Sequence, residues 1–308
     1  MTMFKKLVIV TRNTRLQELV ARFNTRSQAK FYLEHAGGDF ADYEREDDAY
    51  GRALEAVQRS LEFEVPRQVV DRTLVPTFQF QKEDLVVTLG QDGLVANTAK
   101  YVRSQPIVAL NPDAARFDGI LLPFRVSDAR DAVARVLEGK GKIREVTLAE
   151  AMLNDSQRLL AFNDLFIGAH SHVSALYKLT HGKLCETQSS SGVLVSTGAG
   201  STGWVSSVFN MASGVAAFTG GTAGSAFRMP WEDPRLLYVV REPFLSRHSQ
   251  AGIVAGMLRS GEELALESLM PSGGVIFSDG MEADFLEFNS GAIAHVRASE
   301  QRARLVVG

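Results

Sequence analysis

An acidic residue between two glycines is the first place in this sequence where chemistry could occur. Asp92 follows the apolar run Leu85–Leu89, which predicts a buried strand, and Gly90 and Gly93 stand on either side of it. Glycine permits a positive φ and lets a ligand approach the backbone closely. Residues 95–102 predict a helix, and a helix N-terminus attracts anions such as phosphate. The turn is therefore typical either of a phosphate site with a carboxylate beside it or of an ordinary strand-to-helix connection.

A second turn rich in small residues lies further along the chain. The predicted strand Gly192–Val195 leads into the run from Thr197 to Gly203, and Trp204 begins a predicted helix that reaches about Met211. Small side chains let backbone N–H groups reach a phosphate or the edge of a base. A tight β turn has the same composition, so this segment alone leaves both interpretations open.

A polar pair interrupts the predicted strand Arg158–Ile167. Asn163 and Asp164 are adjacent, so the two-residue period of a strand sends their side chains to opposite faces. A buried amide or carboxylate needs a hydrogen-bond partner. We expect that partner to be either a ligand or another part of the protein.

The pattern of the chain changes near residues 139–142. Before this point strand-like runs alternate with helical segments, which is typical of a mostly parallel sheet covered by helices on both faces. After it, short strands follow one another, which predicts a predominantly antiparallel β domain of two packed layers. The expected strands include Gly119–Leu122 and Gln250–Ala255, and Ala212–Gly224 is the expected mobile loop.

Composition narrows the class of protein. With 308 residues the chain is long enough for two domains, and a formal net charge of −3 argues against a nucleic-acid or membrane-surface binder. We find neither a signal peptide nor an apolar run of membrane-spanning length. The single cysteine, Cys185, excludes an intramolecular disulfide and indicates a cytoplasmic protein. His170 and His172 lack a third ligand nearby, so we predict no protein metal site.

Taken in order, the three motifs resemble those of the NAD kinase family, with the closest match to its long, mitochondrial-type branch. That family carries a Gly-Gly-Asp-Gly-Thr turn, an Asn-Glu/Asp pair and a Thr-Pro-Thr-Gly-Ser-Thr-Ala-Tyr-like turn. They match Gly90–Leu94, Asn163–Asp164 and Thr197–Trp204. Nearly the whole chain takes part, since further similarity lies in Phe23–Leu33, Leu110–Asp113, Val240–Phe244 and Ser278–Gly280.

The resemblance implies a domain plan. It comprises a Rossmann-like α/β domain over residues 1–142 with the Gly-Asp-Gly turn, and a predominantly antiparallel β domain over residues 143–285 that completes the dinucleotide site. A C-terminal segment over residues 286–308 then returns to the first domain. Family members commonly pair through the β domain, so the resemblance also implies a homodimer or homotetramer.

The implied reaction transfers the γ-phosphoryl group of ATP to the 2′-hydroxyl of the adenosine ribose of NAD, giving NADP. A ribose hydroxyl is a weak nucleophile, so Asp92 would orient it and accept its proton as general base. Mg²⁺ would be held mainly by the nucleotide phosphates. The implied nucleotide-binding residues are Gly90, Gly93, Asn163, Asp164, Thr197, Gly200, Ser201, Thr202, Trp204 and Asp279.

Two departures from the first family motif keep other functions open. Gln91 stands where the family has its second glycine, and Leu94 stands where it has threonine. A side chain at position 91 could crowd bound phosphates, and the change at position 94 removes a hydroxyl that could bind one. The alternatives to NAD kinase are a kinase of the same superfamily that acts on a lipid or sugar hydroxyl, and a non-catalytic NAD(P)- or nucleotide-binding homologue.

Overall fold

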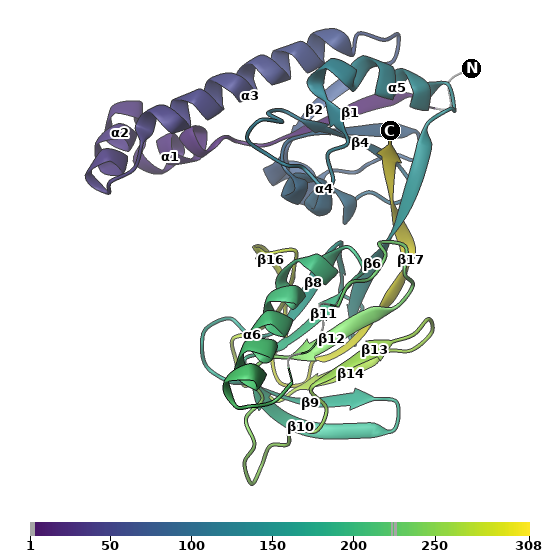
Figure 1. Ribbon diagram of the computed structural model, residues 1–308. Coiled ribbons are helices and arrows are strands. Elements are labelled where there is room, and N and C mark those ends of the chain that lie inside the picture. The colour runs from purple at the N-terminus through teal and green to yellow at the C-terminus, as the bar shows by residue number, and fades with distance from the viewer. Residues whose placement is uncertain (1–3, 223, 225–226) are drawn as a thin grey trace. The chain divides into compact units, whose positions relative to one another are not determined.

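The structure is a computed structural model that describes residues 4–222, 224 and 227–308 (Figure 1). The chain divides into two compact units. Unit 1 comprises Met1–Arg144 together with Arg304–Gly308, and unit 2 comprises Glu145–Ala303. Residues 286–303, which we expected in the returning segment, lie in unit 2. Within the described residues, no helix is long and apolar enough to cross a membrane.

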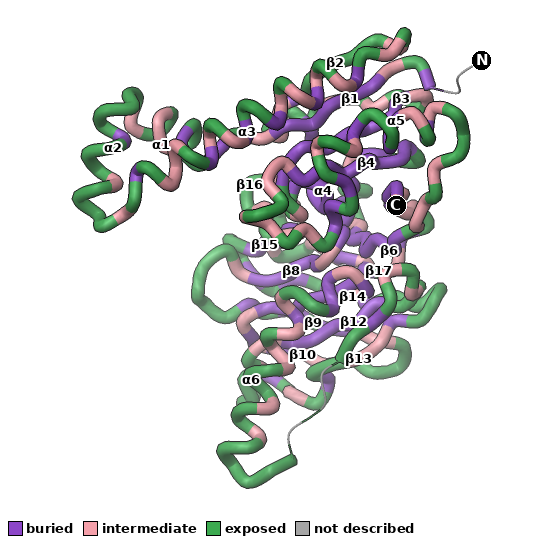
Figure 2. The backbone as a smooth tube through the Cα atoms, turned by 45° about the horizontal axis from the view of Figure 1, so that its top comes forward, coloured by how far each residue is buried: buried purple, intermediate pink, exposed green. Residues whose placement is uncertain are grey.

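Unit 1 is built on a parallel sheet. Its central strands β1, β3 and β4 are apolar along almost their whole length, and Figure 2 shows them as continuous buried stretches. Such runs are typical of parallel strands that are covered on both faces. The order is β2 (Arg67–Asp71), β1 (Lys6–Thr11), β3 (Asp84–Leu89) and β4 (Pro106–Asn111), with β5 (Phe124–Arg125) and the end of β17 (Ile293–Val307) parallel to β4.

Helices pack on both faces of this sheet. On one face α3 (Phe40–Ser60) and α5 (Ala129–Leu137) bury an apolar stripe that contains Tyr50, Val57 and Val133. The short helix α4 (Asp92–Ala99) contacts β3 and β4. Two 3₁₀ turns, η1 and η2, lie at Arg72–Thr77 and Val126–Asp128. These buried stripes agree with the predicted alternation of strands and helices in this part of the chain.

The two remaining helices of unit 1 pack against the N-terminal part of α3. They are α1 (Arg15–Phe23) and α2 (Arg26–His35), and in Figure 1 they lie at the end of α3 that points away from the parallel sheet. Each begins at a threonine whose hydroxyl accepts a backbone N–H, and a small cluster around Leu16, Ala29 and Phe40 holds the three helices together.

Unit 2 contains two sheets that enclose one core. The first sheet contains β10 (Leu184–Ser190), β9 (Ala175–His181), β14 (Leu264–Ser268) and β17, with β6 (Lys142–Leu153) paired to β17 and β7 (Arg158–Ala161). The second has the order β13 (Ala255–Leu258), β12 (Leu236–Val240), β11 (Val193–Ser196), β8 (Asp164–Ala169), β15 (Gly274–Ser278) and β16 (Met281–Glu287). Side chains of both sheets, such as Tyr177 and Tyr238, share the core.

Helix α6 (Trp204–Phe218) covers the other face of the second sheet. Val205 is fully buried there, in a cluster with Leu237 and Val239 of β12. The helix follows a short 3₁₀ turn, η3 (Gly200–Thr202). Its length corrects our expectation of a mobile loop over residues 212–224, because residues 212–218 continue the helix; residue 223 lies outside the described part.

The structure confirms the predicted fold class, an α/β domain followed by an antiparallel β domain, but three predicted strands were wrong. Gly119–Leu122 is a turn, because Gly119 has a φ of 63° and its carbonyl accepts the Leu122 N–H. The expected strand 158–167 is two strands, since the chain passes from the first sheet to the second after β7. Residues 250–254 of the third predicted strand do not form a strand. The N–H groups of residues 252 and 253 donate to the Glu186 carboxylate, so they do not pair with a neighbouring strand.

Candidate functional site

Asp92 is the first residue of α4 and follows the carboxyl end of β3. Its side chain is half-buried, and its Oδ1 accepts a hydrogen bond of 2.7 Å from the backbone N–H of Leu121. Among the described residues Asp92 has no ion pair and its Oδ2 has no hydrogen-bond partner. One carboxylate oxygen is therefore fixed by the protein, and the other is available to a ligand.

The two glycines beside Asp92 act differently from our prediction. Neither Gly90 nor Gly93 adopts a positive φ. A Cβ at position 90 would lie 2.7 Å from Cδ2 of Leu94, whereas a Cβ at position 93 would meet open space. Gly90 thus leaves room for the buried Leu94 side chain, which would have to shift if position 90 carried a Cβ. Of the two departures from the family motif, only Gln91 leaves an exposed side chain beside Asp92.

In unit 2, Asp279 organises the Asn163–Asp164 pair. Its carboxylate accepts hydrogen bonds from the backbone N–H groups of Phe162, Asn163 and Asp164, at 3.0, 2.6 and 3.3 Å. In return the Asp279 N–H donates to the Asp164 carbonyl, and Asp279 holds an unusual φ of 53°. The position of this predicted site residue therefore fixes the start of β8, and with it the direction of the Asp164 side chain.

The Asp164 carboxyl group is buried and lacks a complete set of partners. The residue is 7% exposed, and its Oδ1 has no hydrogen-bond partner in the structure. Burial raises the pKa of Asp164 to about 7. The negative charge of Asp279 also raises this pKa, whereas a hydrogen bond with Ser196 lowers it. An unpartnered buried oxygen is costly, and a ligand hydroxyl is one group that would satisfy it.

The Thr197–Gly203 turn lies directly against Asn163. The Thr197 N–H donates to the Asn163 carbonyl at 2.9 Å, and a Cβ at Gly200 would lie 2.3 Å from the same oxygen. At Gly198 a Cβ would lie 1.8 Å from the carbonyl oxygen of Pro230. The second and third motifs are thus brought together in unit 2, and glycine is needed where backbone meets backbone.

Two of the predicted hydroxyls are engaged within the protein. Thr197 Oγ1 donates to the Phe162 carbonyl at 2.6 Å, and Ser201 Oγ donates to the Gly198 carbonyl at 2.7 Å. Both residues are fully buried, whereas Thr202 is exposed. The turn and α6 border a cavity of about 160 Å³, lined by Ser201, Thr202, Ser206, Phe209, Asn210, Phe227 and Arg228. Sequence reasoning missed Asn210 and Arg228, because no motif includes them.

Trp204 is held in an aromatic stack. Its ring is stacked on that of Phe166, with the centroids 5.7 Å apart, and the guanidinium of Arg241 lies 5.2 Å from the Trp204 ring. Arg241 has no carboxylate partner in the described part of the chain. The structure therefore offers a half-buried indole beside an unpaired positive charge, a combination suited to an anionic or aromatic ligand.

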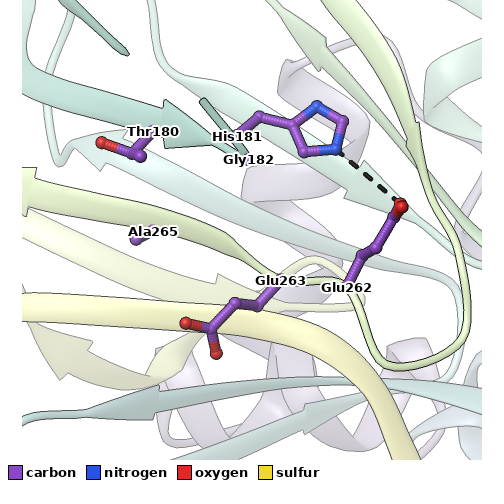
Figure 3. Close-up of a pocket in the computed structure, with 6 residues that line it drawn as sticks. All are labelled: Thr180, His181, Gly182, Glu262, Glu263 and Ala265. Carbon is purple, nitrogen blue, oxygen red and sulfur yellow. Dashed lines mark ion pairs between the residues drawn. The ribbon is translucent and has the colours of Figure 1, made fainter. Parts of the chain in front are cut away.

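A separate pocket of about 320 Å³ lies between the ends of β9 and β14 (Figure 3). Figure 3 shows the His181 ring turned toward Glu262, with Nε2 and Oε2 3.9 Å apart, and the Nδ1 of His181 is hydrogen-bonded to the buried Tyr238 hydroxyl. None of the predicted site residues lines this pocket. The described residues contain no group of three or more histidines, cysteines or acids able to hold a metal. His170 and His172 therefore belong to no such group.

Comparison with known sequences gives one consistent result. No model of a known protein family matches the chain. The NAD kinase of Heliobacterium modesticaldum is 30% identical over 127 residues, which are 39% of this chain and 44% of that protein, and the NAD kinase of Neisseria gonorrhoeae is 32% identical over 129 residues, which are 39% and 43%. A probable NADH kinase of Oryza sativa is 24% identical over 240 residues, 68% of this chain and 69% of that protein.

The resemblance to the NAD kinase family is confirmed. The matched region spans less than half the length of the two bacterial relatives. Among solved structures, yeast NADH kinase complexed with NADH has a TM-score of 0.60 at 17% identity, covering 98% of this chain and 83% of that one. An Archaeoglobus fulgidus NAD kinase in complex with ATP has a TM-score of 0.55 at 14% identity, covering 98% and 93%. This chain has the NAD kinase fold.

The close backbone approach at Gly198 predicts a large effect of one methyl group. We expect Gly198→Ala to lower the free energy of unfolding by at least about 2 kcal/mol, because the Pro230 carbonyl must move. Gly214→Ala in α6 is the matched control, since a Cβ there meets open space, and it should be neutral or stabilising by up to about 1 kcal/mol. Urea unfolding of both variants measures the difference, and equal values would refute the packing argument.

The raised pKa of Asp164 predicts how stability depends on pH. Because the folded pKa of about 7 lies above the ordinary 3.8, the native state retains a proton that the unfolded chain releases between about pH 4 and 7. This group's contribution to the free energy of unfolding therefore falls as the pH rises through that window. Asp164→Asn should gain stability relative to the parent as the pH rises, by about 1 to 4 kcal/mol at pH 8.

Asp155→Asn is the control for this measurement. Hydrogen bonds from Gln157 lower the pKa of the exposed Asp155, so the relative stability of that variant should change with pH in the opposite direction and less steeply. Thermal unfolding from pH 4 to 8 follows both. A pH-independent difference between Asp164→Asn and the parent would contradict the prediction.

Proposed function

We propose that this protein is an ATP-dependent NAD kinase, which transfers the γ-phosphoryl group of ATP to the 2′-hydroxyl of the adenosine ribose of NAD and gives NADP. The fold and the sequence relatives support a kinase of NAD or NADH. The observation that carries the proposal is the Asp92 carboxylate at the carboxyl end of β3, with one oxygen held by Leu121 and the other unengaged.

The chemistry needs a base and a site for charged phosphates. As the bond between the ribose O2′ and the γ-phosphorus forms and the bond to the bridging oxygen of ADP breaks, the hydroxyl proton passes to Oδ2 of Asp92. The first turn of α4 supplies backbone N–H groups to anions beside that carboxylate. The exposed Gln91 side chain lies at the same helix N-terminus, so it is the residue most able to restrict phosphate access.

Unit 2 supplies the groups that we assign to the dinucleotide. The unpartnered Oδ1 of Asp164 would accept a hydrogen bond from a ribose hydroxyl, and Asn163 would add a polar contact beside it. Trp204 would stack on a ring of the ligand, and the exposed Thr202 would face the cavity beside α6. Of the remaining predicted contacts, Gly90, Thr197, Gly200 and Ser201 would act mainly by shaping the two turns, and Asp279 by fixing the start of β8. Gly93 would leave open space for a ligand beside Asp92.

Mg²⁺ would enter with the triphosphate. Its ligands would be mainly the nucleotide phosphates. Among the described residues there is no group of three or more histidines, cysteines or acids able to hold a metal ion. The ion would neutralise charge that develops on the transferred group.

The test is NADP formation from NAD and MgATP, with NADH as a second acceptor. We expect turnover by the parent chain, and a decrease in kcat of about 100-fold or more for Asp92→Asn, because the amide cannot accept the proton. Asp131→Asn, which removes an exposed carboxylate of α5 in the same unit, is the matched control and should keep parental turnover.

The two alternative functions predict different results in activity and binding assays. Turnover with a lipid or sugar hydroxyl but not with NAD or NADH would indicate another kinase of the superfamily. Binding of NAD by calorimetry without any phosphorylation would indicate a nucleotide-binding homologue, and Gln91 would then be the first residue to replace with glycine. The expected homodimer or homotetramer and the cytoplasmic location stay predictions; sedimentation equilibrium addresses the first.

A further inference from the structure

One stripe of α3 contacts the carboxyl ends of three strands of the parallel sheet or the segments that follow them. Asp42, Glu46 and Tyr50 are spaced by four residues, so they lie on one face of the helix, about 6 Å apart along its axis. Their partners lie after β1 and after β4, and at Leu89, the last residue of β3. None of these contacts belongs to the motifs that suggested the function.

Tyr50 ties the end of β3 to the segment after β1. Its hydroxyl donates to the Leu89 carbonyl at 2.9 Å and accepts the Arg12 backbone N–H at 3.0 Å. Burial raises the pKa of Tyr50, so the hydroxyl stays a donor at neutral pH. Leu89 directly precedes the Gly90–Gly93 turn, and this contact therefore fixes one side of the turn that carries Asp92.

Glu46 and Asp42 bind arginines from the loop after β1, the start of α1 and the loop after β4. Glu46, which is 4% exposed, pairs with Arg12 at 2.8 Å and with Nε of Arg15. Asp42 receives both guanidinium ends of Arg116, with Nη2 2.5 Å from Oδ1 and Nη1 3.3 Å from Oδ2. Arg116, and after it Arg15, holds the pKa of the Asp42 carboxyl well below its usual range, so the pair stays charged at neutral pH.

Arg116 lies in the segment that holds Asp92. Residues 112–121, the clamp loop, follow β4 and end at the Leu121 N–H that donates to the Asp92 carboxylate. Asn111 shapes this loop from within, because its Nδ2 donates to the Phe117 carbonyl at 2.9 Å and a Cβ at Gly119 would lie 2.8 Å from the same nitrogen. Arg116 anchors the loop from outside, through α3.

We propose that the Asp42–Arg116 pair fixes the clamp loop so that the Leu121 N–H aims the Asp92 carboxylate, which makes Arg116 a positioning residue of the reaction. The inference rests on the proposed function. A partly exposed ion pair contributes little to stability, whereas a displacement of about 1 Å at a reacting group lowers the rate about 100-fold. Loss of Arg116 should therefore lower kcat clearly, while the free energy of unfolding should change little.

Arg45 provides a matched control. It pairs with Asp42 and Asp39 at 3.4 and 3.1 Å but does not belong to the clamp loop. We expect Arg116→Met to lower kcat about 10-fold with the KM values for NAD and ATP changed less than about twofold. Arg45→Met should keep the parental kcat, and both variants should unfold at similar temperatures. Arg116→Lys, which keeps the charge but loses the fork, should recover part of the rate.

A second pair of variants tests the last contact directly. Leu121→Pro removes the N–H that binds Asp92, whereas Leu121→Ala keeps it and removes a similar amount of buried side chain. We expect the proline variant to have a kcat at least about 30-fold below that of the alanine variant, with similar KM values. Unfolding temperatures of the two variants exclude a loss of folded protein as the cause.

The outcomes separate this inference from the proposed function. If the parent chain phosphorylates NAD or NADH, but Arg116→Met equals Arg45→Met and Leu121→Pro equals Leu121→Ala, the positioning role is refuted and the function stands. If the parent chain has no turnover with any acceptor, both fail together. A kcat defect confined to Arg116→Met and Leu121→Pro supports the positioning role.

Discussion

The hydrogen bond from the Leu121 N–H to Asp92 is the contact on which the candidate chemistry of unit 1 depends. An aspartate side chain can rotate about two bonds and populates several rotamers in water, so contacts that hold it in one orientation make it a more effective base. Here the donor is a backbone group on a loop, and the loop is fixed in turn by Asn111 and by the arginine bound to α3. Contacts with α3 thus help to fix the position of one carboxylate oxygen of Asp92.

Unit 2 uses the same principle with the roles reversed. There the backbone of residues 162–164 donates three N–H groups to one carboxylate, that of Asp279, and the neighbouring Asp164 is left buried with an oxygen unpartnered. One acid is thus held by backbone donors, while its buried neighbour keeps an acceptor atom without a partner. The glycines of the Thr197–Gly203 turn complete the arrangement, because they admit the Asn163 and Pro230 carbonyls at distances that any Cβ would block.

The sequence was sufficient where a property is local. The predicted strand Leu85–Leu89 matches β3 (Asp84–Leu89) to within one residue, because a continuous apolar run is typical of a strand that is buried on both faces. The break between β7 and β8 was not predictable, because it depends on Asp279, which is 116 residues from Asn163. The contact between Leu121 and Asp92 was also not predictable, because every residue except proline has a backbone N–H and the sequence does not mark which one donates. We singled out Gly90 for its freedom of φ, but in the structure it has no positive φ and instead leaves room for the Leu94 side chain.

The division of the chain into two units affects the order in which they can fold during synthesis. Unit 2 is one uninterrupted stretch, Glu145–Ala303, whereas unit 1 is completed only by the last five residues, Arg304–Gly308. Topologically, the β unit is an insertion into the α/β unit, entered through β6 and left through β17, which pair with each other. During synthesis at the ribosome, the parallel sheet therefore lacks its final strand until the β unit has emerged. Until Arg304 and Leu305 are made, Pro106 and Ile107 of β4 lack their partner strand on that side, whereas Leu110 and Asn111 already pair with β5. A variant without residues 304–308 would lack the β17 pairing permanently.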